Sequence, residues 1–546
     1  MRRFFFVFLA VLPFFCSCVA EMEKVDELPP VFPDCVDVTI PYNIAPLDFA
    51  FNDFSNPERC SRMLVVVADW NGRKLMTVRG RTARFPLGKW RRILEANKGS
   101  YLNFGVAMKI DGSWKLFKSF RMNVSWDPID YAVTYRKIMP GYQAFGPMGI
   151  YERELSSFEE RPLLETAAVD ANCMNCHTAN RTDPSSFSTH IRGSHSATIL
   201  NYKGDIQCLD TKTDATGGNF VYPYWHPSGE YIAYSVNTTR QSFYSASDRR
   251  IEVYDEASDV IVYHPASRQI ITSPLLMRKD KFETYPAFSP DGRTLYFCCA
   301  DSVASMPAGC ERLKYSLCCI AFDPERGEFG ERVDTLLSGP RLNRSFATPR
   351  PSYDGSYLMV AVADFGTFHI WHKESDLWML NLEMGCAVPV KPCNSDESES
   401  FHNWSSNSRW VLFVSRRFDG LYSRIFISHV DESGLCSKPF LLPQRNPAEA
   451  HLTSVYSYNV PDFASAPADY RPAAPFRPSS LLHANLFLCA EPFSFPPACL
   501  SVQSLSPSRP LQNDIPGYDG DPIQGLRLRE RVFRSIKNIT AYGHLL

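Results

Sequence analysis

The sequence of 546 residues lacks the features of several large classes of protein. Beyond the N-terminus, no apolar run approaches the roughly 20 residues that a membrane-spanning helix needs. No basic run or basic face suggests a nucleic-acid partner, and the formal net charge is only -2. The chain also contains no G-x-S-x-G motif, no Ser-His-Asp signature and no phosphate-binding loop. These absences favour an electron carrier or an interaction protein over an enzyme that transforms a substrate.

The N-terminus has the pattern of an export signal. It reads "MRRFFFVFLAVLPFFCSCVAEMEK", with two arginines, an apolar run over residues 4–15 and then small residues. We expect a lipoprotein-like signal peptide over residues 1–20, in which Cys18 takes a lipid that anchors the protein to a membrane. Cleavage after Ala20 without a lipid is the alternative. Both interpretations place the protein in the bacterial periplasm or at the outer membrane.

The rest of the chain divides by its hydrophobic pattern. Over residues 35–126, short strand-forming segments alternate with turns such as Asn71-Gly72 and Asp111-Gly112, which predicts hairpins in a β-sandwich-like domain. Residues 127–200 lose this alternation, and repeats fill residues 201–463. Residues 464–546 are rich in proline and serine, so we expect a largely disordered tail.

Four copies of one pattern align without a gap within residues 201–463. They are "VYPYWHPSGEYIAYS" (221–235), "TYPAFSPDGRTLYFC" (284–298), "ATPRPSYDGSYLMVA" (347–361) and "SFHNWSSNSRWVLFV" (400–414). Gly229, Gly292, Gly355 and Ser408 stand at the same place, in a turn between two strand-forming runs. Repeats with about four strands each predict propeller blades, because one such sheet cannot bury both faces alone. The copies resemble the TolB-type repeat, which implies a β-propeller of five or six blades in a mainly β chain.

One motif carries chemistry. "DANCMNCHTANRTD" contains Cys173, Cys176 and His177 in the order C-x-x-C-H. Covalent attachment of haem c needs two thiols to add across the vinyl groups and an adjacent imidazole to bind iron. An export signal favours this interpretation, because haem c is attached outside the inner membrane. We therefore expect residues 127–200 to form a haem c-binding segment with one covalent haem.

Zinc is the competing interpretation of the same cysteines. Cys173, Cys176, His190 and His195 have the spacing of a Cys2His2 zinc site. Asn180 and Ser186 stand where such a finger needs apolar residues for its small core, and zinc gives no role to His177. Spacing alone leaves both metals open.

The second axial ligand of the iron is predicted from the residues that follow the motif. Asp183 as a helix cap, Pro184 in the first turn and Gly193 as a stop predict a short helix over residues 184–192. His190 would lie on one face of this helix with Phe187, so it is the first candidate for the distal ligand. Further candidates are Met148, Met139 and His195.

The order of leader, β-rich domain, "ANCMNCHT" and TolB-like blades resembles a family of large exported bacterial proteins described as cytochrome c related or TolB-like. The resemblance covers residues 30–460. It implies a monohaem cytochrome that passes single electrons to a redox partner in the cell envelope. The alternative is a scaffold that docks an envelope protein complex, in which the C-x-x-C-H motif is accessory or binds zinc.

Overall fold

The computed structural model describes residues 22–139, 148–166, 173–193, 196–212, 216, 218–244, 249–303 and 306–470. All of these residues belong to one compact unit, Met1–Ala490. The predicted leader with Cys18, the candidate ligand His195 and the tail beyond Tyr470 lie outside the described residues. In the part of the chain that the structure describes, no helix has both the length and the apolarity to cross a membrane.

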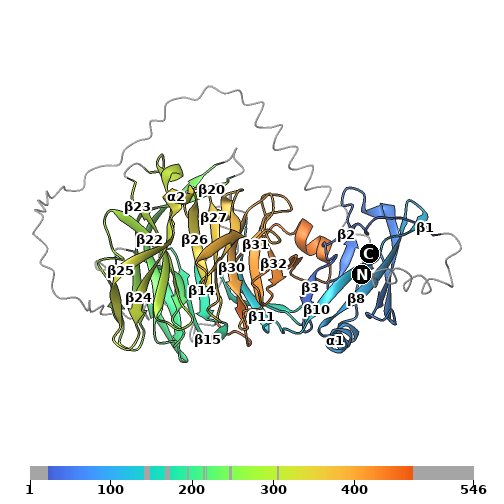
Figure 1. The fold of residues 1–546 in the computed structure, drawn as a ribbon, viewed down its shortest axis with the longest axis horizontal. Helices are drawn as coiled ribbons and strands as arrows, with labels where there is room; N and C mark the ends of the chain where they lie inside the picture. Colours follow the sequence, from blue (N-terminus) through green and yellow to red (C-terminus); the bar gives the residue numbers. More distant parts are fainter. Residues whose placement is uncertain are drawn as a thin grey trace, which may run out of the picture. The chain divides into compact units, whose positions relative to one another are not determined.

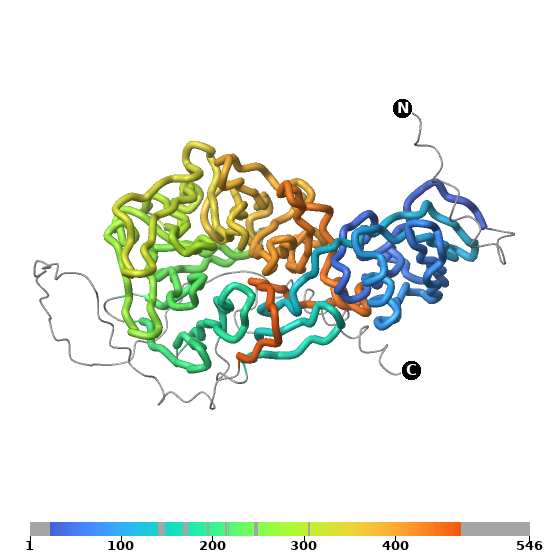
Figure 2. The backbone as a smooth tube through the Cα atoms, turned by 60° about the horizontal axis from the view of Figure 1, so that its bottom comes forward, coloured from blue at the N-terminus to red at the C-terminus, as the bar shows by residue number. Residues whose placement is uncertain are grey.

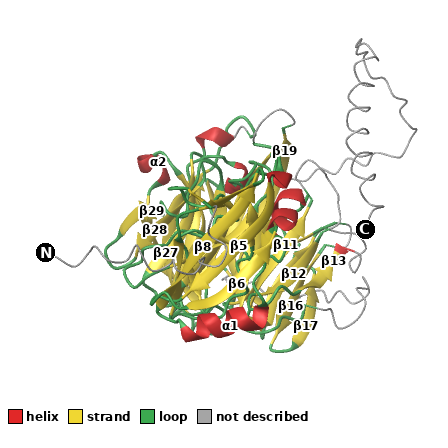
Figure 3. Ribbon diagram, turned by 90° about the vertical axis from the view of Figure 1, so that its right-hand side faces the viewer, coloured by secondary structure: helices red, strands yellow, loops and turns green. Residues whose placement is uncertain are grey.

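Strands dominate the described residues, and helices are few and short (Figure 3). The prediction of a mainly β chain is therefore confirmed. The helical elements are α1 (Leu87–Ala96), α2 (Gly339–Leu342) and the single turns η2 (Pro57–Arg59), η4 (Cys310–Arg312), η5 (His369–Trp371) and η6 (Glu449–Thr453).

The N-terminal part of the described chain contains two sheets. The larger sheet is built from β1 (Glu23–Lys24), β9 (Ser113–Leu116), β8 (Ser100–Ile110), β10 (Phe120–Ser125), β3 (Thr39–Pro41), β5 (Cys60–Ala68) and β6 (Lys74–Gly80). The smaller one is built from β2 (Val31–Phe32), β4 (Phe49–Phe51) and β7 (Thr82–Ala83).

Both sheets and helix α1 share one core. Phe49 of the smaller sheet packs against Phe120 of the larger one with ring centroids 6.4 Å apart, and Trp90 of α1 is fully buried beside them. The predicted hairpins are present. Gly72 lies in the turn between β5 and β6, and Gly112 lies in the turn between β8 and β9, both with positive φ. The turn residues therefore determined where the strands reverse.

From Ala132 onward the chain forms six four-stranded antiparallel sheets within the described residues (Figure 1). The first sheet combines β11 (Ala132–Ile138), β12 (Gly149–Glu154) and β13 (Glu160–Glu165) with the last strand of the chain, β34 (Ser457–Ala464). Each of the other five sheets contains four consecutive strands. In chain order they are β14 (Met174–Asn180), β15 (Asp183–Ile191), β16 (Ala197–Tyr202) and β17 (Asp205–Leu209); β18 (Phe220–Trp225), β19 (Ile232–Phe243), β20 (Ile251–His264) and β21 (Gln269–Ile271); β22 (Lys281–Phe288), β23 (Thr294–Asp301), β24 (Ser316–Asp323) and β25 (Glu328–Leu337); β26 (Ser345–Pro351), β27 (Tyr357–Ala363), β28 (Asp376–Asn381) and β29 (Cys386–Pro389); and β30 (Glu399–Trp404), β31 (Trp410–Ser415), β32 (Arg424–His429) and β33 (Phe440–Leu441).

These sheets form a closed ring, which Figure 2 shows as a succession of colours around a centre. The innermost strands β14, β18, β22, β26, β30 and β34 contact one another in this order, and β34 contacts β14. The last strand, β34, pairs with the first, β11, so the two ends of the ring are joined by main-chain hydrogen bonds. This arrangement is consistent with a propeller-like fold.

The four aligned copies are the first two strands of four successive sheets. Gly229, Gly292 and Gly355 have φ values of 75°, 72° and 79°, and Ser408 has a φ of 59°. The turn requires a left-handed residue, which glycine adopts without the penalty that a Cβ atom brings. The repeated glycine was therefore a sequence signal for the turn itself.

The expected boundaries of the ring and the haem segment need correction. The ring begins at Ala132 rather than at residue 201, and residues 127–200 contribute strands β11 to β16 instead of forming a separate insert. Their strands are hard to recognise because β-bulges interrupt the pairing of β11 with β34, of β12 with β13 and of β14 with β15, and shift the alternation of buried and exposed residues.

The predicted helix over residues 184–192 is wrong. Residues 184–191 belong to strand β15, which pairs with β14 on one side and β16 on the other. The Asp183 side chain accepts a hydrogen bond from the Ser185 backbone N–H, but it does so at the start of a strand after a hairpin turn. Ladder bonds on both sides outweigh the local helix signals, because propensity is a weak preference that tertiary contacts override.

The start of the predicted disordered tail is also structured. Residues 465–470 are described, and the Ser465 backbone N–H donates to the Thr182 oxygen at 2.7 Å. Tyr470 is buried, and its ring packs against Phe187 with centroids 4.1 Å apart. This part of the tail therefore completes the core of the sheet that contains β15.

We expect the closing strand to contribute strongly to stability. Phe463 of β34 is fully buried, so Phe463→Ala should lower the free energy of unfolding by about 3–5 kcal/mol. Denaturation with guanidinium chloride measures this change. Phe243→Ala is the matched control, because Phe243 is 57% exposed and its loss should cost less than about 1 kcal/mol. Equal losses in the two variants would contradict a closed ring.

Candidate functional site

The innermost strand of every sheet in the ring contains the same irregularity. Each strand has a β-bulge where one residue takes a left-handed conformation, with φ between 45° and 54°. The six left-handed residues are Cys176, Tyr222, Tyr285, Thr348, Phe401 and Val460. The C-x-x-C-H motif therefore lies on the bulge of the second sheet.

The residue after each bulge is proline in four sheets and histidine in two. The prolines are Pro223, Pro286, Pro349 and Pro461, and the histidines are His177 and His402. The segment "NCHTA" (175–179) is thus the counterpart of "VYPYW" and its relatives, and "NVPDF" (459–463) is another. Alignment of these short segments was the sequence signal that could have assigned the motif to the ring.

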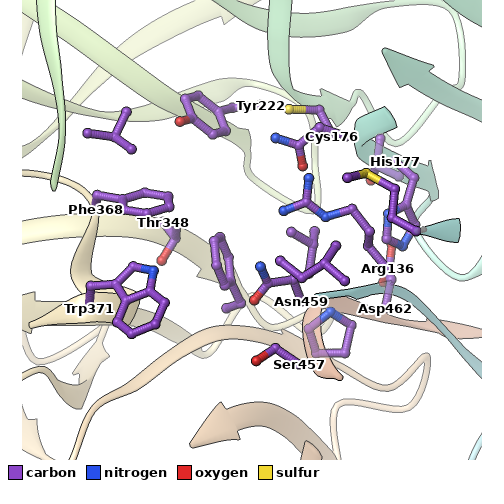
Figure 4. A pocket seen from close by; sticks show the side chains of 18 of the residues that line it. Arg136, Cys176, His177, Tyr222, Thr348, Phe368, Trp371, Ser457, Asn459 and Asp462 are labelled. Atoms are coloured by element: carbon purple, nitrogen blue, oxygen red, sulfur yellow. The ribbon is translucent and has the colours of Figure 1, made fainter. Parts of the chain in front are cut away.

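The bulge residues line one cavity at the centre of the ring. Residues of all six sheets contribute to it, and about 210 Å³ of its volume is open to water. A single buried water needs only about 10–15 Å³. Figure 4 shows Phe368 and Trp371 on one side of this cavity, and Cys176, His177 and Arg136 on the other. The cavity therefore has room for an occupant much larger than water, between an aromatic and a polar wall.

The three motif residues all reach this cavity. Cys173 is partly exposed, Cys176 is buried, and both carry free thiols. His177 is only 2% exposed, and neither of its ring nitrogens has a hydrogen-bond partner among the described residues. Burial lowers the pKa of His177 to about 3, and the Arg136 cation lowers it further, while the Thr134 backbone opposes the shift. The imidazole is therefore neutral near pH 7, which is the form that binds a metal.

These residues fit the requirements of haem c. Two thiols and a neutral imidazole face one space, and the buried ring nitrogens lack the partners that buried polar groups normally have. The described residues contain no group of three or more His, Cys, Asp and Glu side chains arranged to hold a metal ion by themselves. The zinc interpretation also involves His195, which is outside the described residues.

The candidates for the distal ligand lie at two different places in the structure. Met139 and Met148 line the same cavity as His177. His190 instead borders a different cleft with Arg192 and Asn219, and its Nδ1 lies 3.1 Å from the Thr198 hydroxyl. This orientation follows from strand pairing, since His190 is the register partner of Thr198 on β16. The structure thus brings the two methionines to the motif but not His190.

The comparisons with known proteins begin with two negative results. No family model matches the chain, and no curated protein matches it. Among solved structures, prolyl oligopeptidase B from Galerina marginata is similar at 10% identity and a TM-score of 0.31, over 61% of this chain and 42% of that one. The chain thus spans less than half of that peptidase.

Two further solved structures are similar. Dipeptidyl peptidase 4 of Porphyromonas gingivalis has 10% identity and a TM-score of 0.28, over 57% of this chain and 51% of that one. An arabinanase of Bacillus subtilis has 10% identity and a TM-score of 0.23, over 40% of this chain and 77% of that one. With TM-scores below 0.5, none of these likenesses assigns a family or an activity to the chain.

The buried histidines predict a loss of stability in acid. Burial lowers the pKa of His402 to about 3 from the ordinary 6.5, so between these values the unfolded chain binds a proton that the folded chain does not. The free energy of unfolding should therefore fall as the pH falls from 6.5 toward 3. His402→Gln should reduce this slope by up to about 1.4 kcal/mol per pH unit, as measured by chemical denaturation.

The slope of the free energy of unfolding against pH is compared, because the His402→Gln substitution can also change stability by a constant amount at every pH. Ser302→Ala is the control, since Ser302 is exposed and its hydroxyl does not titrate in this range. It should retain the slope of the unmodified protein. A His402 variant with that same slope would show that this histidine is not buried in its neutral form.

Proposed function

We propose that the chain is an exported monohaem c-type cytochrome, in which a six-bladed TolB-like propeller carries the haem in its central cavity. The observation that supports this most is the environment of His177, a neutral buried imidazole without partners that shares the cavity with two free thiols. In this proposal Cys173 and Cys176 form the thioether bonds, and His177 is the proximal ligand. In this proposal the two-sheet domain before the ring corresponds to the β-sandwich-like domain predicted over residues 35–126.

The residues of the cavity have distinct tasks in this proposal. Haem, when bound, supplies one-electron exchange. Burial keeps the imidazole of His177 neutral and ready to ligate, and the β-bulge turns Cys176 and His177 toward the same space. Phe368, Trp371 and Phe401 provide an aromatic wall against which the apolar ring of haem would pack.

The location and the partner follow from the sequence expectations. We propose that the protein acts beyond the inner membrane, held by a lipid on Cys18, and exchanges electrons with a redox partner in the envelope.

Covalent attachment of haem is the first test. The protein expressed with a haem c maturation system should keep its haem after denaturation and should stain for haem peroxidase activity on a gel. Cys173→Ser with Cys176→Ser should abolish the band, whereas Cys386→Ser, a change at an exposed free cysteine, should leave it intact. A protein without a band would refute the proposal, and zinc found by elemental analysis would support the rival metal.

The second test concerns the distal ligand. Because Met139 and Met148 line the cavity, one of Met139→Ala and Met148→Ala should shift the ferric spectrum from low spin toward high spin and let the reduced protein bind carbon monoxide. His190→Ala is the control and should keep the original spectrum, since this histidine borders another cleft. A spectral change confined to the His190 variant would contradict the placement of the two methionines.

A second function has one observation in its favour. His177 occupies the same bulge position as His402, whose Nε2 donates to the Met359 backbone oxygen at 2.9 Å and whose role in the ring is structural. If His177 is structural in the same way, the ring acts as a scaffold that binds an envelope protein. A protein without haem or a redox couple that still captures an envelope complex would support this scaffold.

A further inference from the structure

The central cavity is strongly cationic. Four arginines line it, each from a different part of the ring: Arg136 of β11, Arg192 after β15, Arg350 of β26 and Arg416 after β31. The only carboxylate among the described lining residues is that of Asp462. Burial raises the pKa of Asp462 to about 7, although Arg350 lowers it, so this group neutralises at most one of the four cations. The cavity therefore keeps a net positive charge near pH 7.

None of these arginines is paired with an acid. Among the residues that the structure describes, no carboxylate lies within 4.0 Å of any of the four guanidinium groups. Arg136 donates a hydrogen bond to the Met174 backbone oxygen at 3.1 Å. It also donates to the side-chain oxygen of Asn459 at 3.2 Å, in the amide orientation that satisfies both ends of the Asn459 side chain. These partners are neutral, so the charge of Arg136 is not compensated.

Arg416 is the most enclosed of the four. It is 4% exposed, lies 3.1 Å over the Trp371 ring, and donates to the Leu421 backbone oxygen at 3.0 Å. Its Nε is buried and has no partner among the described residues. Burial lowers the pKa of Arg416 to about 9, although Asp419 and Glu397 act against this shift from a distance. A cation removed from water in this way is costly unless an anion joins it.

The cavity also offers unpartnered groups beside these cations. His402 Nδ1 and the Thr348 hydroxyl are buried without a hydrogen-bond partner among the described residues, and both residues line the cavity. The same cavity is lined by the aromatic rings of Phe368, Trp371 and Phe401, and Figure 4 shows Phe368 and Trp371 on the side opposite Arg136. Guanidinium groups bind carboxylates and phosphates through paired hydrogen bonds, whereas aromatic rings bind an apolar body.

We propose that the central cavity is a binding site for carboxylates carried on an apolar or aromatic skeleton, with the anion bound by the arginines that line it. The arginines match the carboxylates of such a ligand, and the aromatic rings match its skeleton. An inorganic anion would contact only the arginines. The ligand has two possible sources, which are the propionates of an attached haem and a free carboxylate. This site rests on the arginines and the aromatic wall, and it does not require that haem be attached.

The test uses the full chain expressed without haem maturation. Titration calorimetry at low ionic strength would compare benzene tricarboxylate with inorganic phosphate and with benzamide, an uncharged aromatic compound. We expect the tricarboxylate to bind at least about tenfold more tightly than either, and added salt to weaken it. Equal binding of benzamide, tighter binding of phosphate or no binding at all would overturn the proposal.

Substitutions of single arginines test which residues bind the carboxylates. Arg416→Gln and Arg350→Gln should each weaken binding of the tricarboxylate by about tenfold or more, while Arg350→Lys should recover part of the loss. Arg332→Gln is the matched control, because Arg332 is exposed and pairs with Asp334 on the outer strand β25. Denaturation midpoints establish that each variant is folded. If Arg416→Gln does not fold, the two Arg350 variants still decide, and unchanged affinity in both would overturn the proposal.

A final comparison separates the two sources of the carboxylate. The chain expressed without haem maturation carries no haem, and its affinity for the tricarboxylate is compared with that of the chain expressed with a haem c maturation system. If the haem-loaded protein loses this binding by about tenfold or more, the propionates occupy the site. If it keeps the binding, a free carboxylate is the ligand. Failure of haem attachment would leave this site intact, and failure of the haem-free chain to bind the tricarboxylate would overturn the site without affecting the haem test.

Discussion

The left-handed residue in each innermost strand is the constraint on which the rest of the site depends. An ordinary strand would direct alternate side chains to its two faces, and neighbours in sequence would never share a space. The bulge breaks this rule, so that Cys176 and His177 both reach the central cavity. A left-handed β-branched residue is a strained conformation, and Thr348 and Val460 adopt it at the same place. The ladders on the outer side of each strand hold these residues in position.

The interior of the ring departs from the usual rule that buried polar groups are paired. His177, His402 and Arg416 have buried nitrogens without partners among the described residues, and they surround one space. Buried polar atoms without partners also occur elsewhere in the described ring, for example at Trp225, Glu283 and His451, but those of His177, His402 and Arg416 border a space large enough for an occupant. Haem and a free carboxylate differ in how they are attached, yet both would supply what these groups lack, because each combines an apolar body with anionic groups.

The position of His177 explains why the motif admits two interpretations. Four of the six sheets place proline after the bulge, and His402 occupies the same place in the last sheet without any motif around it. The position by itself therefore accepts a residue for purely structural reasons. What distinguishes His177 is its surroundings, since His402 donates to the Met359 backbone oxygen whereas both nitrogens of His177 lack partners in the described chain.

The sequence by itself determined the mainly β fold, the turns with left-handed glycines and the proximity of Cys173, Cys176 and His177, because these depend on residues close together in the chain. Only the tertiary structure decided the rest. Pairing on both sides made residues 183–191 a strand despite their helix signals, and it turned His190 toward Thr198. The ring closed through β34 and β11, which are separated by five other sheets in the sequence. Met139, Met148 and the four arginines met at the cavity because strands far apart in the chain converge on one centre, which no local pattern encodes.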